Sequence, residues 1–233
     1  MIWQTGAMTT ARDRVRAELT REITAEARRQ LATAGADGLS MRAVARELGM
    51  VSSALYRYFP SRDDLLTALI IDAYDALGGA AEAADPGGDD PLARWRAVCR
   101  AVRTWARANR HEYALLYGSP VPGYRAPQDT IAPASRVPLV MLGLLRDSWA
   151  AGTLTVAAES PSARLAAQVE QLAASLDLDL PAPVLTRALV AWTQLFGMVS
   201  FELFGQLVGS VDPSDDFFEY AVEQTARYVG LPG

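Results

Sequence analysis

The stretch LSMRAVARELGMVSSALYRYFPSRDDLL, residues 39–66, decides the fold of this chain. Apolar residues recur in it at helical spacing in two short runs, which Gly49 separates. Glycine suits a tight turn because it accepts a positive φ without a Cβ clash. Ser40 and Ser61 stand where side chains cap helix starts, and Pro60 ends the second run. The stretch therefore predicts two short helices joined by a turn, followed by the start of another helix.

These two short helices have the construction of a helix-turn-helix. Val44, Leu48, Val51 and Leu55 are expected to pack them together, and Leu31 of a preceding helix would brace them. In a DNA-binding helix-turn-helix, the second helix enters the major groove. The pattern alone also fits a purely structural three-helix unit, so both interpretations stay open at this point. If the unit binds DNA, its second helix would present to bases and phosphates the side chains of Ser52, Ser53, Tyr56 and Arg57.

A longer match favours the DNA-binding interpretation. From Arg21 to Leu66 the chain resembles the DNA-binding domain of TetR-type transcriptional regulators, most specifically in the Leu-Tyr-x-x-Phe element at residues 55–59. It departs from the family pattern at Tyr58, often histidine, and at Arg62, often lysine, although both side chains can still donate a hydrogen bond to phosphate. The resemblance implies an all-α protein with a three-helix helix-turn-helix domain and a larger helical domain for ligand binding and dimerisation. The residues expected to contact DNA are Ser40, Arg42, Ser52, Ser53, Tyr56, Arg57, Tyr58 and Arg62.

The distribution of charge agrees with this interpretation, although the whole chain is acidic at a net charge of −5. Residues 1–62 hold ten arginines against six acids, a balance of +4. Residues 63–233 hold twelve arginines against twenty-one acids, a balance of −9. A basic head on an acidic body predicts that only the head meets a polyanion.

Several other classes of protein find little support in the sequence. Cys99 and His111 are single residues of their kinds, too few for a disulfide framework or a Cys/His metal site. The uncharged run 188–201 has fourteen residues, whereas a membrane-spanning helix needs roughly 18. The N-terminus shows no signal-peptide pattern. We therefore expect a cytoplasmic protein with no metal, no cofactor and no membrane contact.

Helical spacing continues through the rest of the chain and predicts nine or ten helices in total. The glycine-rich segment Gly78–Asp90 is the expected linker, and the proline-rich run Gly118–Pro138 is expected to lack regular structure. We divide the chain into an N-terminal arm with the helix-turn-helix domain (residues 1–62), a connecting helix and linker (63–90), and the ligand-binding and dimerisation domain (91–233).

Aromatic residues gather in the second domain, and aromatic or apolar walls are typical of small-molecule pockets. The proline-rich run would supply a mobile wall. The segment WTQLFG at residues 192–197 is similar to the W-x-x-L-H-G element of one TetR C-terminal subgroup, with phenylalanine in place of the histidine. The candidate ligand-binding residues are Trp95, Trp105, Tyr113, Tyr117, Tyr124, Trp149, Trp192 and Phe196.

Two charged motifs have competing interpretations. A stripe of five arginines between residues 96 and 110 is either an anion site or, as base rates favour, a solvated helix face with acidic partners. Asp215, Asp216 and Glu219 have the spacing of a magnesium-diphosphate site in all-helical isoprenoid enzymes. Acids also complement the dipole of a helix start, and no second cluster of metal ligands accompanies them.

These observations together predict a transcriptional regulator, not an enzyme. We expect a homodimeric repressor that binds double-stranded operator DNA and is released by a small, largely apolar effector. The dimer would form through the helices at Val184–Val208 and Asp215–Tyr228, packed as a four-helix bundle. Two alternatives are an all-helical magnesium-dependent diphosphate enzyme and a helical interaction module without DNA binding.

Overall fold

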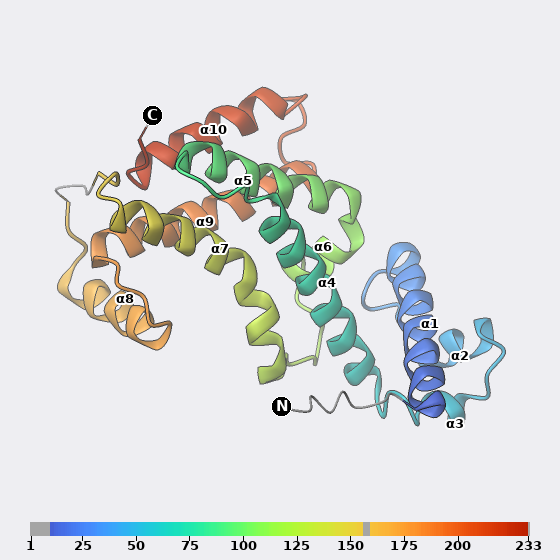
Figure 1. Ribbon diagram of the computed structural model, residues 1–233. Coiled ribbons are helices and arrows are strands. Elements are labelled where there is room, and N and C mark those ends of the chain that lie inside the picture. Colours follow the sequence, from blue (N-terminus) through green and yellow to red (C-terminus); the bar gives the residue numbers. More distant parts are fainter. Residues whose placement is uncertain (1–9, 156–158, 233) are drawn as a thin grey trace, which may run out of the picture.

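The computed structural model describes residues 10–155 and 159–232, and within them it contains ten α-helices, one short 3₁₀ helix and no strand (Figure 1). The predicted all-α fold is confirmed. The helices are α1 (Ala11–Ala34), α2 (Met41–Glu47), α3 (Ser52–Leu55), α4 (Arg62–Ala84), α5 (Pro91–Ala108), α6 (Arg110–Tyr117), η1 (Gln128–Thr130), α7 (Ile131–Ala150), α8 (Ala163–Ser175), α9 (Ala182–Leu203) and α10 (Asp215–Tyr228).

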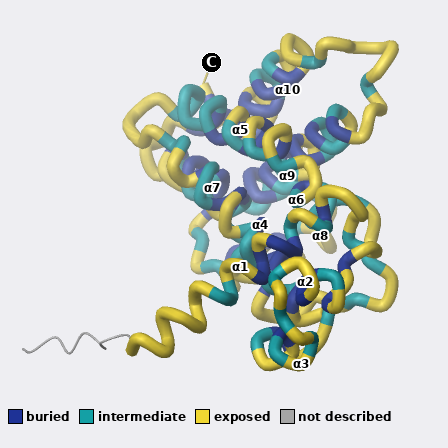
Figure 2. Tube along the Cα trace, turned by 90° about the vertical axis from the view of Figure 1, so that its right-hand side faces the viewer, coloured by how far each residue is buried: buried dark blue, intermediate teal, exposed yellow. Residues whose placement is uncertain are grey.

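Helices α1 to α3 form a small unit at one end of the molecule (Figure 1). α1 begins in a capping box, in which the Thr10 hydroxyl accepts from the Asp13 amide at 3.2 Å and the Asp13 carboxylate accepts from the Thr10 amide at 3.1 Å. Ile23, Leu31 and Leu55 are buried in a core that this unit shares with the start of α4. Figure 2 shows this core at the foot of the molecule, with the first turns of α1 exposed beside it.

Helix α4 connects the small unit to the rest of the molecule and belongs to the cores of both. Its first half contributes Leu65 and Leu69 to the core of the small unit. Its second half contributes Leu77 and Ala81 to the larger core formed by α5 to α10. A movement of α4 would therefore disturb the packing of both units.

α4 is longer than the sequence predicts. Gly78–Ala84, expected as part of the linker, is helical, and residues 85–90 alone connect α4 to α5. The reason is close packing against α7, because a Cβ at Gly78 would lie 2.6 Å from the Cβ of Arg136. The Arg136 guanidinium then donates to the Glu82 carboxylate at 2.8 and 2.6 Å. The glycine permits two helices to approach each other and does not end the helix.

The larger unit packs α5, α7 and α9 around one core, with α10 lying beside α5 and α9 (Figure 1). Its buried side chains come from each of these helices and include Trp95, Val102, Leu144, Leu195 and Val222. α8 packs on α9. Two units with separate cores, joined through one long helix, form the framework on which the candidate sites lie.

α7 corrects the expectation that Gly118–Pro138 lacks regular structure, because the helix begins at Ile131. Pro133 lies in the first turn, where its missing N–H would have no acceptor within the helix. Pro138 lies inside the helix, where it removes one backbone hydrogen bond. The irregular segment is therefore shorter than predicted and ends at η1.

α9 is the most apolar helix and ends at Leu203, before the predicted end at Val208. Among the helices in the described part of the chain, it is long and apolar enough to cross a membrane by length and composition. The core helix of a soluble protein passes the same test. Leu185 and Leu195 are buried in the core, whereas Phe201 is exposed.

Candidate functional site

The turn between α2 and α3 has the geometry that a helix-turn-helix requires. Gly49 has a φ of +65°, and the Met50 amide donates to the Ala45 carbonyl at 2.8 Å to close the turn. At the start of α2, the Ser40 hydroxyl accepts from the Ala43 amide at 3.4 Å. Ser40 thus caps α2, and a contact with phosphate would be an additional role.

The packing of the two short helices differs from the prediction at one residue. Val44 and Leu55 are completely buried, and Leu48 is half-buried, as expected. Val51, however, is 71% exposed. It occupies the N-cap position of α3, where the backbone is extended and not yet helical. Val51 is therefore available at the surface and does not join the core.

The residues predicted to read bases come to the surface in and after α3. Ser53, Tyr56 and Arg57 are exposed, and Ser52 is half-buried. Arg42 is exposed in the first turn of α2. Neither Arg42 nor Arg57 pairs with an acid among the described residues, so both guanidinium groups are available to a polyanion.

Two arginines of α1 extend this surface and were missed in the sequence analysis. Arg12 and Arg16 line a shallow hollow together with Arg57 and Tyr58. The Arg16 guanidinium lies 5.3 Å from the centroid of the Tyr58 ring, in a cation–π arrangement. The spacing of the two arginines on one helix face is the signal that could have identified them. The basic surface therefore includes the start of α1.

Arg62 is placed differently from the other predicted DNA contacts. Its Nε donates to the Leu39 carbonyl at 3.1 Å, and its Nη2 donates to the Ala36 carbonyl at 2.6 Å. Its Nη1 lies 3.8 Å from an Asp63 carboxylate oxygen. Arg62 thus ties the start of α4 to the segment before α2, and a contact with phosphate would fall to Nη1.

A cavity of about 570 Å³ lies between α4, α6, α7 and the segment that connects α6 to α7. Three of the predicted ligand-binding residues line it, namely Tyr117, Tyr124 and Trp192. The remaining lining residues are Ile70, Tyr74, Leu115, Leu116, Val121, Ala126, Thr130, Ile131, Ala134, Ser135 and Pro138. Among these, Tyr74 was overlooked because it shares the apolar face of α4 with core residues.

Two further predicted residues stand behind the cavity wall. The ring of Phe196 lies 4.4 Å from that of Tyr117, and the ring of Tyr113 lies 5.0 Å from it, measured between centroids. The Tyr113 hydroxyl donates to the Phe196 carbonyl at 3.0 Å. Burial raises the pKa of Tyr113 to about 12, against a hydrogen bond with Ser200 that lowers it. The rings of Phe196 and Tyr113 therefore pack against the Tyr117 ring, which lines the cavity.

The other three predicted ligand-binding residues do not line this cavity. Trp95 is buried in the larger core, and Trp105 and Trp149 pack against that core. Helical spacing marks both core and cavity aromatics, so sequence alone does not separate them. Of the eight predicted residues, Tyr117, Tyr124 and Trp192 are the ones that line this cavity.

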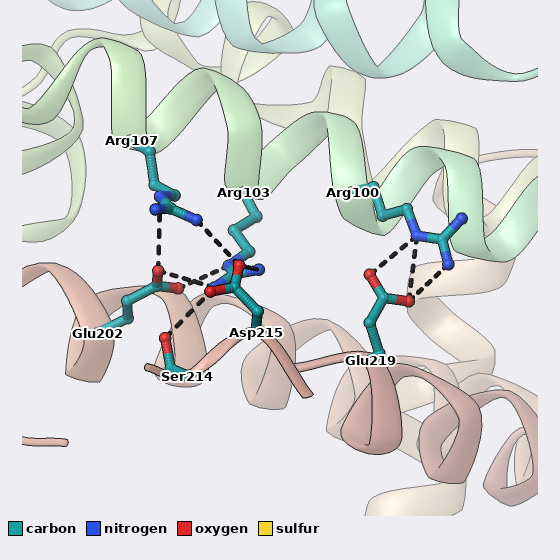
Figure 3. A network of polar contacts seen from close by, with 7 residues as sticks. All are labelled: Arg100, Arg103, Arg107, Glu202, Ser214, Asp215 and Glu219. Atoms are coloured by element: carbon teal, nitrogen blue, oxygen red, sulfur yellow. Dashed lines mark hydrogen bonds and ion pairs between the residues drawn. The ribbon is translucent and has the colours of Figure 1, made fainter. Parts of the chain in front are cut away.

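Four of the five arginines of the stripe lie on α5 and form ion pairs with α9 and α10, as the interpretation with acidic partners predicts (Figure 3). The fifth, Arg110, lies on α6 and donates to the Leu203 carbonyl at 2.6 Å. Arg103 donates to Glu202 at 2.7 and 2.9 Å and to Asp215 at 3.0 Å. Arg100 donates to Glu219 at distances of 2.6 to 3.1 Å. Two of the three acids proposed for a magnesium-diphosphate site are therefore held by arginines. This cluster of arginines and acids joins α5 to α9 and α10.

Two family models match consecutive parts of the chain. The model described as bacterial regulatory proteins, tetR family, matches residues 23–69. The model described as Tetracyclin repressor-like, C-terminal domain, matches residues 95–225. The chain belongs to the TetR family. A TetR-family chain is a DNA-binding transcription regulator, which confirms the predicted family and overturns the alternative of a diphosphate enzyme.

One known relative covers most of this TetR-family regulator, and another covers about half of it. The HTH-type transcriptional regulator Rv1816 of Mycobacterium tuberculosis is 41% identical over 197 residues, 82% of this chain and 83% of the relative. The HTH-type transcriptional repressor DrrR1 of Streptomyces coeruleorubidus is 34% identical over 118 residues, 49% of this chain and 40% of that protein. The W-x-x-L-H-G resemblance and the individual contact residues stay predictions.

Solved structures share the arrangement of helices. The crystal structure of the regulatory protein SCO4313 has a TM-score of 0.78 at 36% identity, covering 93% of this chain and 98% of that one. The TetR-family regulator PfmR of Thermus thermophilus has a TM-score of 0.56 at 20% identity, covering 91% of this chain and 98% of that one. The second likeness concerns the fold alone.

Proposed function

We propose that this protein is a dimeric repressor that leaves double-stranded operator DNA when a small, largely apolar effector fills the cavity between α4 and α7. The observation that carries this proposal is the position of Ile70. Its side chain belongs to the core of the helix-turn-helix unit and also lines the cavity. An occupant of the cavity therefore touches the residues that support the DNA-binding unit.

Further contacts support coupling between the two units. The Tyr124 and Thr67 hydroxyls are 2.9 Å apart, which ties the segment before α7 to α4. Arg28 of α1 pairs with Asp72 of α4 at 2.6 Å and with Glu112 of α6 at 2.9 Å. An effector that fits one arrangement of these helices better than another shifts the population by its difference in affinity.

The proposed DNA contacts divide into two groups. Base edges would be read by Ser52, Ser53, Tyr56 and Arg57, and phosphates would be held by Ser40, Arg42, Tyr58 and Arg62. Arg12 and Arg16 join the phosphate group because they lie beside Tyr58 and Arg57. Contacts to phosphate give a steep dependence of affinity on salt, because each arginine releases counterions.

The proposed homodimer rests on apolar side chains that α9 and α10 leave exposed. Phe201 is 55% exposed on α9, and Phe217 and Tyr220 are exposed on α10. One helix-turn-helix reads few base pairs, so a second copy is needed for a useful operator. Light scattering at micromolar protein would give the mass of two chains, and the mass of one chain would contradict the dimer.

The remaining parts of the proposal concern the direction of regulation, the bounds of the domains and the place in the cell. Repression agrees with the name of the relative DrrR1. We place the arm and helix-turn-helix in residues 1–62, the connecting helix and linker in 63–90, and ligand binding with dimerisation in 91–233. A regulator of this kind works in the cytoplasm, without a cofactor.

A footprint on the DNA upstream of the protein's own gene tests the proposal. We expect protection of two half-sites in successive major grooves, with centres roughly 34–36 Å or more apart. The protection should weaken steeply as salt rises, and it should disappear with metabolites of the neighbouring genes. No protection of that DNA at low salt would overturn the proposed repressor.

A further inference from the structure

The hydroxyl groups of the cavity differ in whether they already have partners. Tyr124 shares a hydrogen bond of 2.9 Å with Thr67. The Thr130 hydroxyl donates to the Pro127 carbonyl at 2.7 Å, and the Ser135 hydroxyl donates to the Ile131 carbonyl at 2.8 Å. These three hydroxyls are satisfied within the protein and hold the wall in place.

Tyr74 and Tyr117 are the exceptions among the hydroxyls, and the indole Nε1 of Trp192 is a third donor of the wall without a partner among the described residues. Both line the cavity, and neither hydroxyl has a hydrogen-bond partner among the described residues. Their rings meet edge to face, with centroids 6.2 Å apart and planes at 89°. Burial raises the pKa of both phenols, so both keep their protons at neutral pH. Each is a hydrogen-bond donor without an acceptor, at the wall of an apolar cavity.

The cavity is also free of charge, because none of its fourteen described lining residues is an acid or a base. An ion that entered it would lose hydration without gaining a partner, which costs several kcal/mol or more. The rings of Tyr74, Tyr117, Tyr124 and Trp192 contribute aromatic surface to the wall. Aromatic faces attract cations, but no carboxylate is present here to balance one.

We propose that the cavity takes an uncharged, fused-ring or aromatic molecule whose carbonyl oxygen accepts hydrogen bonds from Tyr74 and Tyr117. A carbonyl oxygen has two lone pairs and can serve both donors, whereas a pure hydrocarbon leaves them unpaired. This inference rests on the proposed function for the location of the effector site. It goes further by naming the chemistry of the ligand and the two residues that recognise it.

Matched probes test this recognition on the full-length protein. N-phenyl-1-naphthylamine reports occupancy by its fluorescence, and fluorenone and fluorene compete with it. Fluorene is the more hydrophobic of the two competitors, so a preference for fluorenone must come from its carbonyl group. We expect fluorenone to bind about 2- to 12-fold more tightly than fluorene if it accepts one neutral hydrogen bond, and up to about 150-fold more tightly if it accepts two. The Tyr74→Phe and Tyr117→Phe double variant should lose most of this preference, and only the Trp192 Nε1 then stays as a donor at the wall.

A control variant separates this effect from a general disturbance. Tyr228→Phe also removes one hydroxyl, but from α10 and outside the cavity, and it should keep the preference for fluorenone. Equal affinities for fluorenone and fluorene in the unaltered protein would overturn the inference. So would the failure of N-phenyl-1-naphthylamine to bind, or a preference for fluorenone that is undiminished in the double variant.

Charged probes give a second test. 8-Anilinonaphthalene-1-sulfonate carries the same rings as the neutral probe plus a sulfonate, and it should bind at least tenfold more weakly. Tighter binding of tetraphenylphosphonium than of fluorenone would show a cation site and overturn the inference.

Release of operator DNA is measured separately. If fluorenone binds through the two tyrosines but operator affinity stays constant, the ligand chemistry stands and the proposed coupling fails.

Discussion

Arg57 and Arg42 both present an unpaired guanidinium at the proposed DNA surface, but we expect them to contribute differently. Arg57 follows α3, where it can reach a base edge, and Arg57→Ala should cost about 1–3 kcal/mol and relax specificity at one position. Arg42→Ala should weaken binding to all sequences alike and lower the salt slope. Affinities for operator and scrambled duplexes measure both effects. Unchanged operator affinity in Arg57→Ala would show that α3 is not the reading helix.

A pair of adjacent glycines in α4 gives a prediction for stability. A Cβ at Gly78 would lie 2.6 Å from the Arg136 Cβ, so Gly78→Ala must push α7 away and should cost about 1–3 kcal/mol of unfolding free energy. At Gly79 the nearest atom is Nη2 of Arg136 at 3.6 Å, an ordinary contact. Gly79→Ala should therefore be neutral or stabilising by up to about 1 kcal/mol, because alanine favours the helix. Urea unfolding of both variants measures the change in the free energy of unfolding. Equal changes in Gly78→Ala and Gly79→Ala would contradict the packing argument.

Helix α5 holds α9 and α10 through its arginines, and the strength of each contact should follow its burial. Arg103 is 8% exposed and Glu202 is 14% exposed, so Arg103→Met leaves a buried carboxylate with only Arg107 at 3.6 Å and should cost up to about 3–5 kcal/mol. Arg100 is 55% exposed in its pair with Glu219, and Arg100→Met should cost at most about 1 kcal/mol. Thermal unfolding at constant protein concentration compares the stability of the Arg103→Met and Arg100→Met variants. A loss of similar size in both variants would show that burial does not set the strength of these pairs.

The helices were predictable from sequence where local signals determine them. The turn at Gly49 and the caps at Ser40 and Ser61 are fixed by neighbours within a few residues, and the structure agrees there. The continuation of α4 through Gly78 depends on Arg136, which is distant in sequence, so the glycine resembled a helix end. Pro138 likewise resembled a break, although α7 continues through it.

The cavity was predictable in part for a related reason. An aromatic residue on the apolar face of a helix faces either the core or a cavity, and spacing does not distinguish these. Trp95 belongs to the core, whereas Trp192 lines the cavity. Tyr74 lines it from α4, a helix assigned at first to the linkage between units. The partners of a side chain come from other helices, and sequence does not state which ones these are.

At the scale of the whole molecule, the hydrogen bond between Tyr124 and Thr67 is one point at which the cavity wall holds the helix shared by both units. An effector that favours the released state should weaken operator binding by about 5- to 150-fold, and operator must weaken effector binding by the same factor. Reciprocity allows a weak probe to measure this factor. It is the ratio of the affinities for N-phenyl-1-naphthylamine without and with saturating operator duplex.

Tyr124→Phe removes that hydrogen bond while keeping the ring in the wall, and Thr67→Val removes it from the other side. Each substitution should bring the coupling factor closer to one. The affinity of the free protein for the probe should change by a smaller factor than the coupling factor does. Because both substitutions remove a single contact, the double variant should show no further loss. Ser135→Ala is the control, since the Ser135 hydroxyl lines the same cavity but bonds within its own helix. A coupling factor that stays constant in Tyr124→Phe would place the link between the units elsewhere, and the ion pairs of Arg28 with Asp72 and Glu112 would be the next contacts to remove.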